Sequence, residues 1–218
     1  MTTITIVLGN KAYSSWSLRA WLILTQTGAP FEEIVIPLDR PESRRRILEH
    51  SPSGRVPALK VDGLLIWDTF AIAEFLNERF PDANIWPSGT EARAQARAAS
   101  AEMHAGFATL RERLPMDLHR DPPAGPPTAL SGDLKADVDR VVAIWTDCRA
   151  RFGGAGDFLF GEFSAADAFY APVVTRFVTY GVELGGAAAA YRDTVMAWPA
   201  MRTWITAAKA EPWVIENP

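Results

Sequence analysis

The chain has 218 residues, 48% of them hydrophobic and 22% charged, and carries a formal net charge of −4. This balance is typical of a globular protein, and a mildly acidic chain lacks the electrostatic footprint of a nucleic-acid binder. Its single cysteine, Cys148, cannot form an intrachain disulfide, which suits a reducing compartment, so we expect a cytoplasmic protein. The first ten residues are typical of a strand and not of a signal peptide, and the chain has no apolar run of membrane-spanning length.

Strand and helix patterns alternate over the first 80 residues. Two β-branched runs, 3–8 and 31–36, flank a helical pattern that begins after Ser14 and Ser15 and stops at Gly28. A strand–helix–strand unit of this length has parallel strands. The elements expected after it are a charged helix over 41–50, strands over 58–61 and 64–67 joined by the hairpin signal Asp62–Gly63, and a helix capped by Thr69 that reaches Phe80.

Beyond residue 90 the strand signal disappears and every apolar pattern is helical. Helices are expected over 91–114, 134–152, 164–180, 187–196 and 199–210, with a break at the proline-rich segment 121–127. We therefore predict two domains joined by a turn-rich linker. The first, residues 1–81, is an α/β domain with the order βαβ-α-ββα, and the second, residues 88–218, is an all-α helical bundle.

The loop Tyr13-Ser14-Ser15-Trp16 lies between the first strand and the first helix. A helix N-terminus carries unpaired N–H groups and roughly half a positive charge, so it favours an anion such as a thiolate. A serine hydroxyl there can donate a hydrogen bond to that thiolate, or it can simply cap the helix, which is the commoner use of serine. Lowering the pKa of a free thiol by about two units needs roughly 2.7 kcal/mol, the size of one charge-assisted hydrogen bond plus the helix dipole.

Two further segments of the first domain carry groups that could bind a peptide-like ligand. At Arg55-Val56-Pro57, a cis Val56–Pro57 bond would turn the backbone N–H and C=O of Val56 outward like an open strand edge, and an ordinary trans-proline is the alternative. Asp68 and Thr69 precede the third helix, where they can cap it or hold an α-ammonium and an α-carboxylate. Together with the serine loop, both segments could converge on one extended tripeptide.

Four motifs follow one another along the chain: residues 14–24 (SSWSLRAWLIL), 51–59 (SPSGRVPAL), 68–76 (DTFAIAEFL) and 158–167 (FLFG, then SAAD). The first is similar to SSCSWR of the zeta class, and the others look like NP-x-GKVPAL, E-S-x-A-I-x-x-Y-L and G-x-x-x-S-x-A-D. In this order they resemble the cytosolic glutathione S-transferase family, of a bacterial, serine type with a zeta-like N-terminal motif. The resemblance implies a thioredoxin-like first domain, an all-helical second domain and glutathione as co-substrate.

The resemblance also implies roles for individual residues. Ser14 matches the serine that activates the glutathione thiol, with Ser15 as its helix-capping neighbour, and both are candidate catalytic residues. The implied glutathione-binding residues are Arg55 at the glycine carboxylate, Val56 and Pro57 beside the cysteinyl unit, and Asp68 and Thr69 at the γ-glutamyl group. Trp16 in place of the motif's cysteine, and Leu18 in place of its tryptophan, weaken a zeta-type assignment.

The second substrate would occupy a pocket beside the first helix of the bundle. The candidate pocket residues are Tyr13, Trp16, Met103, His104 and Phe107. Tyr13 is also the rival of Ser14 as the donor to the thiolate. Cys148 lies on an apolar stripe, where it is expected to be inert core. The histidines have no partners at metal-ligand spacing, so no metal site is expected.

Three functional hypotheses follow from the resemblance. The leading one is a homodimeric detoxification enzyme that conjugates reduced glutathione to a small hydrophobic electrophile. The first rival is a glutathione-dependent cis–trans isomerase of the maleylacetoacetate isomerase type, which would need cationic groups in the second pocket, with Arg19 as the nearest candidate. The second rival is a binding module that has the transferase fold and no chemistry.

Overall fold

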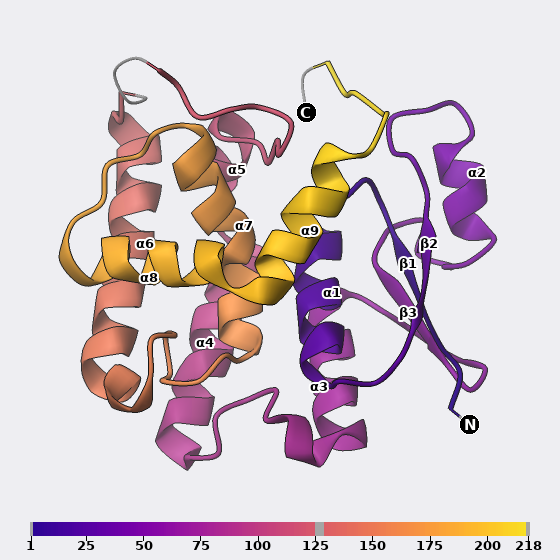
Figure 1. The fold of residues 1–218 in the computed structure, drawn as a ribbon, viewed down its shortest axis with the longest axis horizontal. Coiled ribbons are helices and arrows are strands. Elements are labelled where there is room, and N and C mark those ends of the chain that lie inside the picture. Colours follow the sequence, from indigo (N-terminus) through magenta and orange to yellow (C-terminus); the bar gives the residue numbers. More distant parts are fainter. Residues whose placement is uncertain (1, 125–128, 217–218) are drawn as a thin grey trace.

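The computed structural model describes residues 2–124 and 129–216, so part of the predicted break at 121–127 lies outside the described residues. A sheet-containing part and a helical part lie side by side (Figure 1). The sheet has the order β2-β1-β3-β4, with β1 at Ile4–Leu8, β2 at Glu32–Val35, β3 at Ala58–Val61 and β4 at Leu64–Trp67. As predicted, β1 runs parallel to β2 and β3 pairs with β4 in a hairpin, and β3 lies antiparallel to β1.

Successive side chains of β1 enter two different cores because a strand sends them to opposite faces of the sheet. Ile6 and Leu8 belong to the main core, which also contains the apolar residues of α1 (Ser15–Gln26) and α3 (Thr69–Arg79). Val7 belongs to a smaller core with Ile36 and with Ile47 of α2 (Ser43–Leu48). The sheet is therefore covered on both faces, as an α/β domain requires.

The second part of the chain is helical, and its central helix joins it to the first part. Its helices are α4 (Thr90–Ala105), α5 (Ala108–Arg113), α6 (Gly132–Phe152), α7 (Ala165–Thr179), α8 (Gly186–Ala197) and α9 (Pro199–Lys209). Helix α7 is buried almost throughout and packs against both α1 and α4. It begins with the predicted capping box, in which the Ser164 N–H donates to the Asp167 Oδ2 at 2.8 Å.

The helix predicted over 91–114 is in fact two helices, and the prediction of one long helix is wrong. Gly106 turns to an extended conformation, and Phe107 has a left-handed φ of 60° with its ring buried in the core. The Arg111 guanidinium donates to the carbonyl oxygens of Met103 and Gly106, which α4 leaves unpaired at its end. A Cβ at Gly106 would lie 2.9 Å from the Glu102 carbonyl oxygen, so a glycine is required there.

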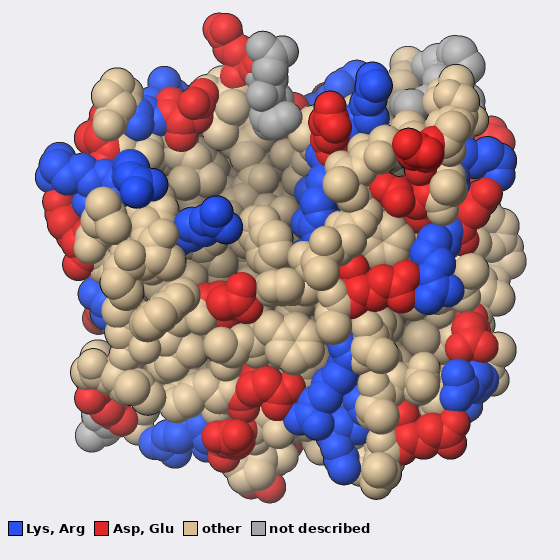
Figure 2. Space-filling model, turned by 180° about the vertical axis from the view of Figure 1, so that it is seen from behind, with Lys and Arg blue, Asp and Glu red and all other residues tan. Residues whose placement is uncertain are grey.

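One face of the molecule carries charges of both signs. On the face seen in Figure 2, acidic and basic groups are interspersed among uncharged ones. None of the helices within residues 2–124 and 129–216 combines the length and apolar character needed to cross a membrane.

Candidate functional site

Helix α1 begins at a compact hydrogen-bonded cluster of serines. Ser14 is the N-cap residue, and the N–H of Ser17 donates to its Oγ at 3.2 Å. The Ser14 hydroxyl donates to the Oγ of Ser17 at 2.8 Å, and that Oγ also accepts from the Gly9 N–H at 2.9 Å. The capping role expected for Ser15 therefore belongs to Ser14, because Ser15 is already the first residue of the helix.

A cleft of about 560 Å³ opens beside this helix, between the two parts of the chain. It is lined by Trp16, Ser53, Arg55, Val56, Pro57, Trp67, Asp68, Thr69 and His104. The structure thus brings together all five predicted glutathione-binding residues, from two separate segments, with two of the predicted pocket residues, Trp16 and His104. Neither Ser53 nor Trp67 is among the residues predicted for the site: Ser53 lies within the 51–59 motif, and Trp67 directly precedes Asp68.

The N-terminus of α3 forms one wall of the cleft. Its N-cap residue is Asp68, not Thr69 as the sequence predicts, and Asp68 Oδ1 accepts from the Phe70 N–H at 2.8 Å. Asp68 adopts a left-handed φ of 73°, a strained conformation for a non-glycine residue. Thr69 is fully buried, and its Oγ1 has no hydrogen-bond partner within the described chain. A buried hydroxyl without a partner beside a helix N-terminus suits an incoming carboxylate.

The loop before β3 forms the facing wall. The Val56–Pro57 peptide bond is cis, as predicted. Neither the N–H nor the C=O of Val56 has a hydrogen-bond partner among the residues the structure describes. An extended peptide could therefore pair with this backbone like an added strand.

His104, from α4, closes the cleft on the side of the helical part. Its Nε2 lies 3.4 Å from Asp68 Oδ2, and its ring makes an edge contact with Trp16 at 5.0 Å between centroids. Desolvation by burial lowers the pKa of His104, and the nearby carboxylate of Asp68 only partly opposes this shift. His104 therefore stands neutral near pH 7 between the two parts of the chain.

Two guanidinium groups lie against the Trp16 ring, and a third, from Arg176, is close enough to act on the charge of Arg19. Arg19 is fully buried with Nε, Nη1 and Nη2 unpartnered in the described part of the chain, and its Cζ lies 4.6 Å from the Trp16 ring centroid. Arg111 lies 5.2 Å from the same centroid. Burial lowers the pKa of Arg19 well below its usual value and that of Arg176 to about 9, and the neighbouring guanidinium charges add to both effects. The sequence pointed to Arg19 alone, because Arg111 and Arg176 belong to no motif.

The remaining predicted residues do not line the cleft. The Tyr13 hydroxyl is 3.1 Å from His119 Nδ1, and His119 Nε2 is 2.9 Å from the Ala208 carbonyl oxygen. The tautomer with a proton on Nε2 satisfies both contacts, so the Tyr13 hydroxyl donates to His119. Met103 and Phe107 are buried in the core. Cys148 is buried too, and desolvation raises the pKa of its thiol to about 11, as expected of an inert side chain.

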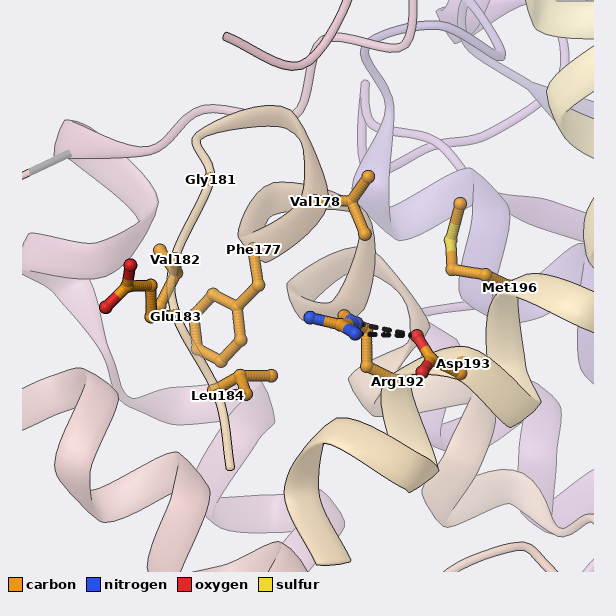
Figure 3. A pocket seen from close by; sticks show the side chains of 9 residues that line it. All are labelled: Phe177, Val178, Gly181, Val182, Glu183, Leu184, Arg192, Asp193 and Met196. Atoms are coloured by element: carbon orange, nitrogen blue, oxygen red, sulfur yellow. Dashed lines mark hydrogen bonds and ion pairs between the residues drawn. The ribbon is translucent and has the colours of Figure 1, made fainter. Parts of the chain in front are cut away.

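A second hollow of about 720 Å³ lies on the helical part, between the end of α7 and α8 (Figure 3). Its guanidinium, from Arg192, is paired with the adjacent Asp193 at 2.8 Å. Phe177 and Leu184 supply an apolar floor, and no predicted site residue reaches it. The motif-lined cleft is therefore the candidate site.

Comparison with known proteins shows the family of the chain. A sequence model of the glutathione S-transferase N-terminal domain matches residues 13–79, and one of the glutathione S-transferase C-terminal domain matches residues 91–207. A glutathione transferase homolog from Burkholderia GL BGR1, solved with bound glutathione, has the same fold: the TM-score is 0.72 over 96% of this chain and all of that one, at 22% identity. A tau-class glutathione S-transferase from mango gives 0.70 over 95% and 96% of the two chains, at 18% identity.

Curated relatives match over shorter stretches. A probable maleylacetoacetate isomerase from Caenorhabditis elegans is 31% identical over 51% of this chain and 52% of its own, and a dichloromethane dehalogenase from Methylorubrum extorquens is 40% identical over 30% and 24%. The chain thus spans about half of the length of the first and about a quarter of the length of the second. A stringent starvation protein A homolog from Pasteurella multocida is 25% identical over 76% and 72%.

Proposed function

The chain belongs to the glutathione S-transferase family, and we propose that it binds reduced glutathione in the cleft and transfers it to a small hydrophobic electrophile. One observation carries the proposal: the cleft holds a fully buried, unpartnered hydroxyl, Thr69 Oγ1, at the N-terminus of α3. Leaving such a group unpaired costs about 1–3 kcal/mol, a cost that a bound carboxylate would remove.

In the proposed complex, glutathione lies extended across the cleft. Its γ-glutamyl carboxylate accepts from Thr69 and the α3 N–H groups, and Asp68 Oδ2, which is not used by the helix cap, pairs with the ammonium. The cysteinyl backbone pairs with the free N–H and C=O of Val56, and Arg55 faces the glycine carboxylate. These contacts need no cofactor besides glutathione itself.

The thiol would be ionised at the N-terminus of α1. The Ser14 hydrogen is donated to Ser17 Oγ, and a rotation of both hydroxyls would let Ser17 donate to Ser14 instead. The 2.8 Å contact would be kept, while the Ser14 hydrogen would turn to the thiolate. The thiolate then attacks the electrophilic carbon, and the leaving group departs with its bonding electron pair. Trp16, which lines the cleft next to the serines, supplies an apolar wall for the electrophile.

A test of the proposal starts with binding. Glutathione titrated calorimetrically into the wild type should bind, and chloro-aromatic electrophiles should be turned over with loss of chloride. Glutathione binding without turnover of any electrophile in a broad panel would contradict the enzyme and favour the binding module. No binding at millimolar glutathione would contradict both.

The isomerase is a second candidate, favoured by the guanidinium groups of Arg19, Arg111 and Arg176. Buried cations without carboxylate partners are costly, and the rings of Trp16 and Phe169 compensate Arg19 only in part. A dicarboxylate entering behind Trp16 would neutralise them. Maleyl-type acids should then be isomerised in the presence of glutathione, and Arg176→Met should abolish this turnover while Arg202→Met, on the exposed face of α9, leaves it unchanged.

We also propose that the protein is a homodimer, the usual assembly of the enzymes it resembles. Helix α4 is rich in alanine, so a second copy could approach it closely. Sedimentation equilibrium at micromolar concentration should give twice the mass of one chain. The mass of a single chain would contradict this assembly.

A further inference from the structure

The loop between β1 and α1, residues 9–13, is held by residues of the helical part. The Leu118 N–H donates to the Ala12 carbonyl oxygen at 3.1 Å, and the Trp204 Nε1 donates to the Lys11 carbonyl oxygen at 3.0 Å. Helix α9, which carries Trp204, runs beside α1 (Figure 1). The loop that leads into Ser14 is therefore shaped by residues of the helical part as well as by its own sequence.

Glu211 contacts the same loop with both of its carboxylate oxygens. It follows α9, and its Oε1 accepts from the Lys11 N–H at 2.8 Å while its Oε2 accepts from the Ala12 N–H at 3.2 Å. One carboxylate thus accepts from two consecutive backbone N–H groups. Such charge-assisted bonds are stronger than neutral ones, and the two together fix both the position and the orientation of this peptide unit.

The side chain of Lys11 is held as firmly as its backbone. Its Nζ lies 2.5 Å from Glu33 Oε2, and it stands 5.7 Å and 5.3 Å from the ring centroids of Trp21 and Trp204. Rotation of the loop about Lys11 would break the ion pair and both aromatic contacts. Glu211 thus holds the backbone of a residue whose side chain is already fixed. We call the two hydrogen bonds from Lys11 and Ala12 to Glu211 the clamp.

The clamped loop sets the position of the capping serine. The Tyr13 and Ser14 N–H groups both donate to the Asn10 carbonyl oxygen, at 3.2 Å and 2.8 Å, so residues 10–14 form one turn. We propose that Glu211 is a positioning residue, which holds this turn so that the Ser14 hydroxyl meets the glutathione thiolate. The inference rests on the proposed function.

The charge and the geometry of Glu211 act on the thiolate in opposite directions. A nearby carboxylate disfavours a second anion, so its charge alone would raise the pKa of the bound thiol. Its hydrogen bonds hold the donor in place, which lowers that pKa. A variant that removes the charge of Glu211 separates the two effects. The pKa of the bound thiol falls if the charge matters more and rises if the hydrogen bonds matter more.

The experiment compares three variants with the wild type. Glu211→Gln keeps the length and loses the charge, Glu211→Asp keeps the charge and loses the reach, and Glu112→Gln changes an exposed glutamate of α5 as the control. Amide hydrogen exchange at Lys11 and Ala12 reports the clamp without glutathione. The ultraviolet absorbance of the bound thiolate against pH, together with kcat and KM, reports its effect on the site.

We expect exchange at both amides to rise about tenfold in each Glu211 variant, because each loses at least one of the two hydrogen bonds. The thiol pKa should rise in both, with kcat at pH 6.5 falling severalfold and KM for glutathione nearly unchanged, and the control should match the wild type. A lower thiol pKa in Glu211→Gln, or a loss of thermal stability with exchange and thiol pKa unchanged, would overturn the positioning role. If glutathione fails to ionise on the wild type, the proposed function is wrong, and unchanged amide exchange in the variants would separately refute the clamp.

Discussion

The N-termini of α1 and α3 face the same site but are built differently. At α1, the Ser14 hydroxyl is satisfied in both directions by Ser17 of its own helix, and the backbone is relaxed. At α3, the cap Asp68 is strained, and the buried Thr69 hydroxyl has no protein partner among the described residues. A hydroxyl that already has its hydrogen-bond partners gains little from a ligand, whereas a buried hydroxyl without a partner gains a hydrogen bond when a ligand arrives. We therefore propose that α3 supplies affinity for glutathione and that α1 supplies the ionisation of its thiol.

The largest expected effect is on glutathione affinity at α3. Thr69→Val keeps the shape of the side chain and removes the hydroxyl, and should weaken glutathione about tenfold to a hundredfold, since hydrogen bonds to charged groups contribute about 1.5–3 kcal/mol. The free energy of unfolding of the ligand-free protein should stay the same or rise, because a buried unpaired hydroxyl is gone. Calorimetric titration and urea unfolding measure the two quantities. An unchanged affinity for glutathione would contradict the assignment of its binding to the N-terminus of α3.

The next effect is on thiol ionisation at α1. Ser14→Ala should raise the pKa of bound glutathione by about one unit or more, about 1.4 kcal/mol, while affinity stays within severalfold. It should also cost about 1 kcal/mol of stability, since Ser14 is the helix cap.

Two variants serve as controls for Ser14. Tyr13→Phe should leave the thiol pKa unchanged because that hydroxyl donates to His119, and Ser15→Ala should change it little. Loss of turnover in Tyr13→Phe with activity retained in Ser14→Ala would move the thiol donor to the tyrosine.

Ser17→Ala should also raise the pKa of bound glutathione, but by less than Ser14→Ala does. Without Ser17 Oγ, the Ser14 hydroxyl loses the partner that would donate to it once its own hydrogen turns to the thiolate. The thiol pKa should rise by about half a unit, or roughly 0.7 kcal/mol. Absorbance titration of the bound thiol measures it, and a pKa equal to that of the wild type would show that Ser14 acts without this support.

The smallest effect concerns pH at the contact between His104 and Asp68. Burial lowers the pKa of His104 in the folded protein, so between that value and the unfolded pKa of about 6.5 the unfolded chain binds more protons. The free energy of unfolding should therefore be constant, as far as His104 is concerned, above about pH 6.5, and it should fall as the pH drops from 6.5 towards the lower pKa of folded His104. Protonated His104 would also compete with the glutathione ammonium for Asp68. Affinity measured from pH 7.5 to 5.5 should fall less in His104→Asn than in the wild type, with His50→Asn as the control.

Local chemistry accounts for much of what the sequence predicted correctly. The hairpin follows from Asp62–Gly63, whose φ values of 49° and 88° are the left-handed pair that such a turn requires. The capping box at Ser164 and Asp167 and the cis bond at Val56–Pro57 are likewise local, and short motifs report them. The segments that line the cleft could be named for the same reason, because each of them has its own pattern.

The predictions that missed were those that depend on packing or on a choice between equivalent residues. The apolar pattern over 91–114 continues past Gly106, and the break there is decided by the placement of Phe107 in the core and of Arg111 on the last carbonyl groups of α4. Whether Ser14 or Ser15 capped α1 could not be told from two adjacent serines, because both satisfy the same pattern.

The sequence by itself therefore determined the elements, the order of the two parts and the segments that build the cleft, since these depend on periodicity and short-range turn chemistry. Only the tertiary structure decided what surrounds those segments. It set His104 against Asp68, brought the charges of Arg111 and Arg176 close to Arg19, and brought Glu211 to the loop that it follows by 200 residues. A single charged residue on a helix or at its end carries no periodic signal, so its partner becomes known only when the chain has folded around it.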